Sequence, residues 1–175
     1  MVLAFEPVNY LYAALTKSIA ENGFDGRCRA FNCALSEHAG RGTIRHALGT
    51  LNFGGGHLVQ AKQSDNHEYD EVEVKVLSDF ISDTRCSLIK LDVEGNEMKV
   101  LRGGVDLLRR DRPAVFVELF NEQLERVSQC NANDVLGFMA GLGYRCFETS
   151  SGEAGAEITS YASKDLINVI FLPRN

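Results

Sequence analysis

The sequence lacks several features that mark common classes of protein. No apolar run approaches the roughly 20 residues that a membrane-spanning helix needs, and the first residues lack the basic start and long apolar core of a secretion signal. We therefore expect a cytoplasmic protein with no membrane partner. The five cysteines form no C-x-x-C pair, and the four histidines form no H-x-x-x-H or H-E-x-x-H pattern. Neither residue type predicts a metal site.

Positive charge is also scarce, with 18 lysines and arginines against 24 acidic residues and a formal net charge of -6. A protein that binds nucleic acid generally needs a cationic surface, so we expect no nucleic-acid partner. What is present is ordinary for a globular protein: 45% of the residues are hydrophobic and 24% are charged. With 175 residues, the chain is long enough for one domain with its own core, and we expect residues 1–175 to form a single domain.

The first half of the chain alternates between strand and helix patterns. A short apolar strand precedes Glu6, and Leu11, Leu15 and Ile19 then recur at helical spacing. "CRAFNCALS", residues 28–36, predicts a second strand. Residues 37–70 are rich in glycine and predict an irregular insertion with hairpin character. "EVEVKV" then alternates with period two, as a half-exposed strand does, and "LSDFI" predicts a short helix.

The second half predicts further strands and helices. "SLIKLDV", residues 87–93, predicts a strand, and Met98, Leu101, Val105 and Leu108 predict one helix behind it. "PAVFVELF" is typical of a strand covered on both faces, and two helices follow it. The last two strands, "RCFET" and "LINVIFLP", are joined by a segment without helical period, so they should be antiparallel. These patterns predict an α/β domain with a mostly parallel sheet and an antiparallel final strand pair.

Acidic side chains stand where several of the predicted strands end. In an open α/β sheet, ligands bind outside the carboxyl ends of the strands. Glu6 follows the first strand, where a carboxylate is able to accept hydrogen bonds from the two hydroxyls of a ribose. A solvated strand-end carboxylate is the alternative interpretation. Glu118, in "VFVELF", is either a second functional acid or one member of an ion pair with a nearby arginine or lysine.

Three further acids, Asp92, Glu94 and Glu97, surround a glycine at the end of "LIKLDV". Such a group could bind a divalent cation, accept a substrate proton or hold the cationic part of a ligand. Glu97 is interpreted mainly as a helix-start charge, because acids there favour the helix dipole. Asp92 is embedded in apolar strand sequence, so we expect it to be buried and to need a partner. Gly95 fits a tight turn between strand and helix.

The glycine run at residues 54–56 does not have the order of a phosphate-binding loop. We interpret it as the tip of a hairpin. A weaker alternative is that "NFGGGH" closes over a substrate, with Arg41, Arg45 and Lys62 near an anionic group, although solvated surface charge is the more ordinary role for each.

Four segments, in their order and spacing, resemble the FkbM-type family of S-adenosylmethionine-dependent methyltransferases: "AFEPVNYLYAAL", "NCALSEHAGRGT", "LIKLDVEGNEMKVLRGG" and "PAVFVEL". The resemblance implies a class I, Rossmann-like fold and O-methylation of a hydroxyl on a sugar, glycan or natural product. It also implies that Glu6 holds the cofactor ribose and that Ala34, Leu35 and Ser36 border the adenine. Asp92 and Glu94 would lie beside the methionine moiety and the reacting hydroxyl, and Glu118 would line the substrate side.

The resemblance also points to a missing part. In the family, a strand with a glycine-rich loop precedes the strand that ends in "FEP", and it would lie between the strands ending at Glu6 and Asp92. The chain is therefore expected to be N-terminally truncated relative to the family, and an upstream segment or a partner would complete the sheet. An exposed sheet edge would favour self-association. The alternative function is a truncated, non-catalytic binding or interaction domain.

Overall fold

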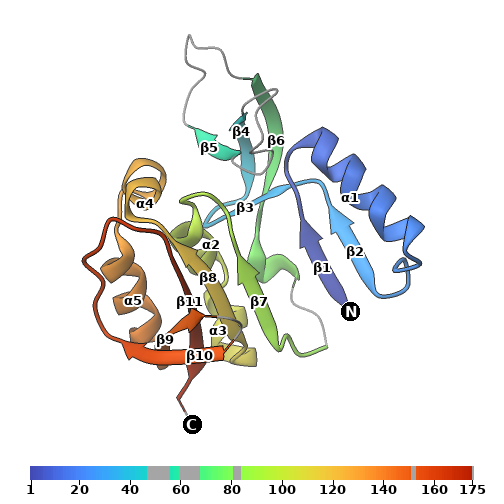
Figure 1. Ribbon diagram of the computed structural model, residues 1–175. Coiled ribbons are helices and arrows are strands. Elements are labelled where there is room, and N and C mark those ends of the chain that lie inside the picture. Colours follow the sequence, from blue (N-terminus) through green and yellow to red (C-terminus); the bar gives the residue numbers. More distant parts are fainter. Residues whose placement is uncertain (47–55, 60–67, 81–83, 151–152, 175) are drawn as a thin grey trace. The chain divides into compact units, whose positions relative to one another are not determined.

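The computed structural model describes residues 1–46, 56–59, 68–80, 84–150 and 153–174 (Figure 1). The chain divides into two compact units, Met1–Val76 and Leu77–Asn175, called here the N-terminal and the C-terminal unit. Each unit has its own sheets, so the expectation of a single domain stays a prediction. In the described residues, no helix is long and apolar enough to cross a membrane.

The N-terminal unit begins with a strand, a helix and a parallel strand, as the sequence predicts (Figure 1). Strand β1 (Val2–Phe5) pairs with β2 (Cys28–Phe31), and helix α1 (Asn9–Glu21) connects them. The rings of Phe5 and Phe31 stack across the two strands with their centroids 5.3 Å apart. After α1 the chain turns at Gly23, whose φ of +66° suits glycine.

A second sheet in this unit has the order β3-β6-β4-β5. Its strands are β3 (Ala34–Ser36), β4 (Gly40–His46), β5 (His57–Val59) and β6 (Glu68–Val76). The antiparallel pairs β4–β5 and β4–β6 lie in the glycine-rich region for which hairpin character is expected. Buried apolar residues form the core of the unit: Val8, Ala34, Ile44, Val72 and Val74.

The prediction of one strand over residues 28–36 is wrong. The segment forms β2 and β3, which belong to different sheets. The break lies at Asn32, whose side-chain amide donates to the backbone oxygens of Glu6 and Pro7 at 3.0 and 3.2 Å. These bonds join the end of β2 to the end of β1 and interrupt the strand, which an apolar pattern alone does not reveal.

The C-terminal unit contains one sheet of order β10-β9-β11-β8-β7 (Figure 1). Its strands are β7 (Leu88–Leu91), β8 (Ala114–Leu119), β9 (Tyr144–Ser150), β10 (Glu153–Ile158) and β11 (Ile167–Pro173). Strands β9 and β11 are antiparallel, which confirms the expected final pair. Strand β10 was not predicted, because "EAGAEI" carries little apolar alternation and pairs at the edge of the sheet through its backbone.

The expectation of a mostly parallel sheet is wrong for the described residues. Three strand pairs are parallel, β1–β2, β3–β6 and β7–β8, and five are antiparallel. The antiparallel pairs come from the hairpin in the N-terminal unit and from β9, β10 and β11 in the C-terminal unit. The fold is therefore mixed α/β.

Helices of the C-terminal unit begin with a short 3₁₀ helix, η1 (Leu77–Phe80), as "LSDFI" predicts. Four α-helices follow: α2 (Glu97–Gly103), α3 (Val105–Asp111), α4 (Asn121–Ser128) and α5 (Ala132–Gly141). The prediction of a single helix around residues 98–108 is therefore wrong, because the helix is interrupted at Gly104. A Cβ there would lie 3.0 Å from Leu77 Cδ2, so the glycine allows η1 to pack closely. The predicted apolar stripe is retained across the break, with Met98, Leu101 and Leu108 buried.

Candidate functional site

The connection between β7 and α2, residues 92–97, carries the predicted site acids Asp92 and Glu94 as well as Glu97, and it is called here the acidic turn. Two successive residues have left-handed backbone geometry, Glu94 with φ +53° and Gly95 with φ +97°. This geometry is uncommon for a residue with a side chain and often marks a functional site. A Cβ on Gly95 would overlap the backbone carbonyl of Gln123 in α4. The expectation of a tight turn at Gly95 is confirmed.

Asp92 lies just past the end of β7 and is exposed, so the expectation that it is buried is wrong. The apolar run ends one residue earlier, at Leu91, which is 3% exposed. The Asp92 carboxylate accepts a hydrogen bond from Lys90 Nζ at 2.8 Å, and 44% of its side chain is accessible to solvent. Its partner is therefore a neighbouring surface lysine.

Glu94 is partly buried, and its Oε2 accepts a hydrogen bond from Gln123 Nε2. Burial raises the pKa of the Glu94 carboxyl, the bond from Gln123 opposes that rise, and the negative charge of Asp92 adds to it. A carboxylate in such surroundings binds a proton more readily than one in water.

Glu97 is the first residue of α2, which confirms the predicted helix-start position, and it is also buried. It is only 3% exposed. Its Oε1 accepts the backbone N–H groups of Val93 and Gly95 at 3.2 and 3.3 Å, while no hydrogen-bond donor among the described residues reaches its Oε2. Burial raises the pKa of the Glu97 carboxyl, and the backbone hydrogen bonds partly oppose that rise.

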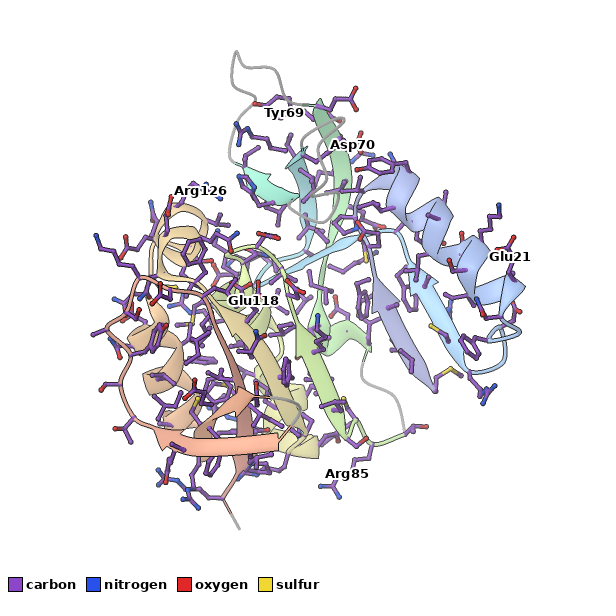
Figure 2. All side chains as sticks on the ribbon, viewed as in Figure 1. Glu21, Tyr69, Asp70, Arg85, Glu118 and Arg126 are labelled. Carbon is purple, nitrogen blue, oxygen red and sulfur yellow. The ribbon has the colours of Figure 1, made fainter. Side chains whose placement is uncertain are left out.

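Glu118 is partly buried near the end of β8, the strand that pairs with β7 (Figure 2). Burial raises its pKa first, and the negative charges of Asp92 and Glu94 raise it further. Lys90 lowers it, but this lysine forms its ion pair with Asp92. Glu118 thus lies within the electrostatic influence of Asp92 and Glu94, and its functional role stays a prediction.

The other predicted site residues lie in the N-terminal unit. Glu6 directly follows β1, and its Oε1 accepts the backbone N–H of Val8, the N-cap of α1, at 2.8 Å. Burial raises the pKa of Glu6, and the Val8 bond partly opposes that rise. Glu6 is thus partly buried and tied to its own turn, which differs from the simple solvated alternative. Ala34 and Leu35 are buried and Ser36 is partly buried, all in β3.

The predicted residues thus form two groups, one in each unit. The C-terminal unit holds the acidic turn and Glu118, and the N-terminal unit holds Glu6 with residues 34–36. Arg41 and Arg45 lie on β4, while Lys62 and residues 54–55 fall outside the described residues, so the idea of a closing loop stays a prediction. Across the residues with described positions, no group of three or more histidine, cysteine or acidic side chains is arranged to hold a metal ion.

Two residues of α4 were missed by the sequence reasoning. Gln123 binds Glu94, and Ser128 Oγ donates to the backbone oxygen of Gly95 at 2.6 Å. Both residues belong to a polar helix and look like solvated positions in the sequence. The available signal was Gly95 itself, since a glycine in a tight turn often marks a close neighbour, but nothing in the sequence identifies that neighbour as α4.

Comparison with known proteins adds independent findings. The sequence model of the family described as "Methyltransferase FkbM domain" matches residues 1–146, which confirms the resemblance predicted from the motifs. The crystal structure of methyltransferase FkbM from Methylobacillus flagellatus KT is similar, with a TM-score of 0.58 and 16% sequence identity. The match covers 97% of this chain and 36% of that one, so the chain spans about a third of the solved relative's length. No curated protein matches the chain.

Proposed function

Since the chain belongs to the FkbM methyltransferase domain family, we propose that it carries out S-adenosylmethionine-dependent transfer of a methyl group to a hydroxyl of a sugar, glycan or natural product. The family supports methyl transfer in general. The cofactor, the hydroxyl acceptor and activity by this part of the protein belong to the proposal. The observation that carries it is the acidic turn together with Glu118: Asp92 and Glu94 follow β7, Glu118 lies near the end of the paired strand β8, and the charges of Asp92 and Glu94 raise the pKa of Glu118.

Glu94 is the best candidate for the residue that accepts the proton of the hydroxyl. A hydroxyl oxygen must lose its proton as it forms the bond to the methyl carbon, and a nearby carboxylate is able to take that proton. Glu94 is partly buried and its pKa is raised by burial and by Asp92, so it attracts a proton more strongly than an exposed acid. Its fixed position would also orient the acceptor oxygen. Asp92 and Glu118 would hold other hydroxyls of the acceptor.

S-adenosylmethionine, when bound, supplies the electrophilic methyl group. Glu6 fits the ribose, because a carboxylate offers about four acceptor sites and the Val8 N–H occupies one of them. The apolar side chains of Ala34 and Leu35 suit the neighbourhood of an adenine ring. We further propose a class I, Rossmann-like methyltransferase fold.

A non-catalytic binding or interaction domain is the second candidate function. One observation favours it: both predicted proton acceptors already have partners, Asp92 in Lys90 and Glu94 in Gln123. In an enzyme, the acceptor hydroxyl would have to displace or share these bonds.

Calorimetric titration of residues 1–175 with S-adenosylmethionine and S-adenosylhomocysteine separates the two functions. We expect binding of both compounds, weakened in Glu6→Ala and unchanged in Glu21→Ala, which changes an exposed acid of the same unit. If neither compound binds, this chain does not use the cofactor by itself, and the binding or interaction domain becomes the better description.

A further inference from the structure

We propose that Glu97 is a positioning residue: its buried carboxylate fixes the backbone of the acidic turn and thereby the directions of Asp92 and Glu94. The effect on methyl transfer rests on the proposed function, but the effect on the turn does not. The proposal starts from a contrast in burial, because Glu97 is 3% exposed, while on the same turn Asp92 is exposed and Glu94 is only partly buried.

The contacts of Glu97 are placed where they control Glu94. Oε1 accepts the N–H groups of Val93 and Gly95, the residues on either side of Glu94. One carboxylate oxygen therefore ties both ends of the Glu94 residue to the start of α2. A rotation of the backbone at Glu94 would have to break at least one of these bonds.

The turn needs such a constraint because its geometry is unfavourable. Glu94 and Gly95 are both in the left-handed region, and a residue with a side chain persists there only when its surroundings fix it. Relaxation of Glu94 to a common conformation would redirect its side chain. Helix α4 holds the other side of the turn, through Ser128 Oγ on the Gly95 oxygen and Gln123 on Glu94.

Stability alone does not explain why a carboxylate occupies this buried place. Asp111, at the end of α3, is a second buried acid in the same unit and serves as a comparison. It is 4% exposed, accepts the N–H of Cys86 at 2.8 Å and pairs with Arg110, which holds its pKa down to about 2. Glu97 has no ion pair among the described residues, its Oε2 lacks a donor there, and burial raises its pKa. The hydrogen bonds by which Glu97 stabilises the structure are therefore those that it accepts from the N–H groups of Val93 and Gly95.

Amide hydrogen exchange followed by NMR tests the proposal directly. We expect Glu97→Asp, which retains the charge but shortens the side chain, and Glu97→Met, which removes the oxygen atoms, to speed exchange at Val93 and Gly95 by about tenfold, the loss expected for one hydrogen bond. Exchange at Val115 and Val117 in β8 should change much less. Glu97→Gln retains an acceptor oxygen and should restore most of the protection.

Asp111→Asn is the matched control, because it changes a buried carboxylate of the same unit that does not contact the turn. It should leave exchange at Val93 and Gly95 unchanged relative to β8. The proposal is wrong if Glu97→Asp leaves the two amides as protected as in the wild type, or if Asp111→Asn loosens them equally. A wild-type chain that fails to bind S-adenosylmethionine would count against the proposed function, and the exchange result would still decide the role of Glu97. Where methyl transfer is measured, Glu97→Asp and Glu97→Met should lower kcat more than they raise KM, and Glu97→Gln should keep most of the wild-type kcat.

Discussion

Two connections in this protein share one sequence plan, an apolar strand followed by an acid and a helix, yet they differ in structure. After β1, Glu6 caps its own turn through the Val8 N–H, and the non-glycine residues there keep ordinary backbone geometry. After β7, Glu94 and Gly95 take left-handed geometry, a buried Glu97 ties the turn, and α4 packs against it. The difference teaches that strand-end acids are not equivalent: one connection is a simple cap, and the other is a constrained platform for acidic side chains.

Among the substitutions that test the difference between the two connections, Gly95→Ala should lower the free energy of unfolding the most. The added Cβ would overlap the Gln123 carbonyl and would also occupy a backbone with φ +97°, so we expect a loss of about 3 kcal/mol or more in the free energy of unfolding. Gly23→Ala is the control, because Gly23 has φ +66° but no atom within 4 Å of an added Cβ. It should cost about 1 kcal/mol, the backbone penalty alone. Urea denaturation measures both, and equal losses would contradict the close packing of α4 on the turn.

Glu97 and Asp111 should affect the pH dependence of folding stability in opposite directions. The pKa of Glu97 is raised in the folded state, so its contribution to stability is complete below its ordinary value of 4.5 and is lost as the pH rises through the folded pKa. The pKa of Asp111 is lowered to about 2, so its contribution is present above 3.8 and is lost as the pH falls through about 2.

Replacing each acid by its amide should therefore weaken the pH dependence of the free energy of unfolding, at higher pH for Glu97 and at low pH for Asp111. Glu97→Gln should reduce the loss of stability above pH 4.5, and Asp111→Asn should reduce the loss in acid. Thermal unfolding between acid and neutral pH measures both variants. A Glu97→Gln protein with the pH dependence of the wild type would show that Glu97 titrates normally.

Ser128→Ala should have a smaller effect, because it removes one hydrogen bond between α4 and the turn. The bond from Ser128 Oγ to the Gly95 oxygen measures 2.6 Å, and its loss should lower the free energy of unfolding by about 1 kcal/mol. Ser18→Ala removes an exposed hydroxyl from α1 and should change stability little. If Ser128→Ala and Ser18→Ala have the same free energy of unfolding, the hydrogen bond between Ser128 and the turn contributes nothing to stability.

Sequence reasoning located the strand-end acids because apolar strands and charged strand ends are local patterns. It also identified the family, since short motifs such as "KLDVEGNE" retain their order. It misjudged the burial of Asp92, because burial depends on which elements pack nearby: Leu91 is buried at the end of β7, while Asp92 directly after it is exposed. It placed Glu97 at the start of a helix, as the structure does, but nothing in the sequence indicates that Glu97 is buried. Local patterns could not place α4, since Gln123 and Ser128 meet the turn only after folding.

The same reason explains the misjudged elements of the fold. The break between β2 and β3 depends on Asn32 bonding to the end of β1, and the break between α2 and α3 depends on Leu77 packing at Gly104. Strand β10 forms by pairing its backbone with β9. Each of these features is decided by a partner that is distant in the sequence.

Methyl transfer by Glu94→Gln tests the central claim most directly. Residues 1–175 would be incubated with S-adenosylmethionine carrying a labelled methyl group and with a panel of sugars, glycans and natural-product alcohols, alongside Glu125→Gln, which changes an exposed acid on α4. If Glu94 accepts the hydroxyl proton, its amide variant should lose about a hundredfold or more in rate while Glu125→Gln keeps the wild-type rate. A wild-type rate in Glu94→Gln would contradict the assignment of the acidic turn as the reacting part of the protein.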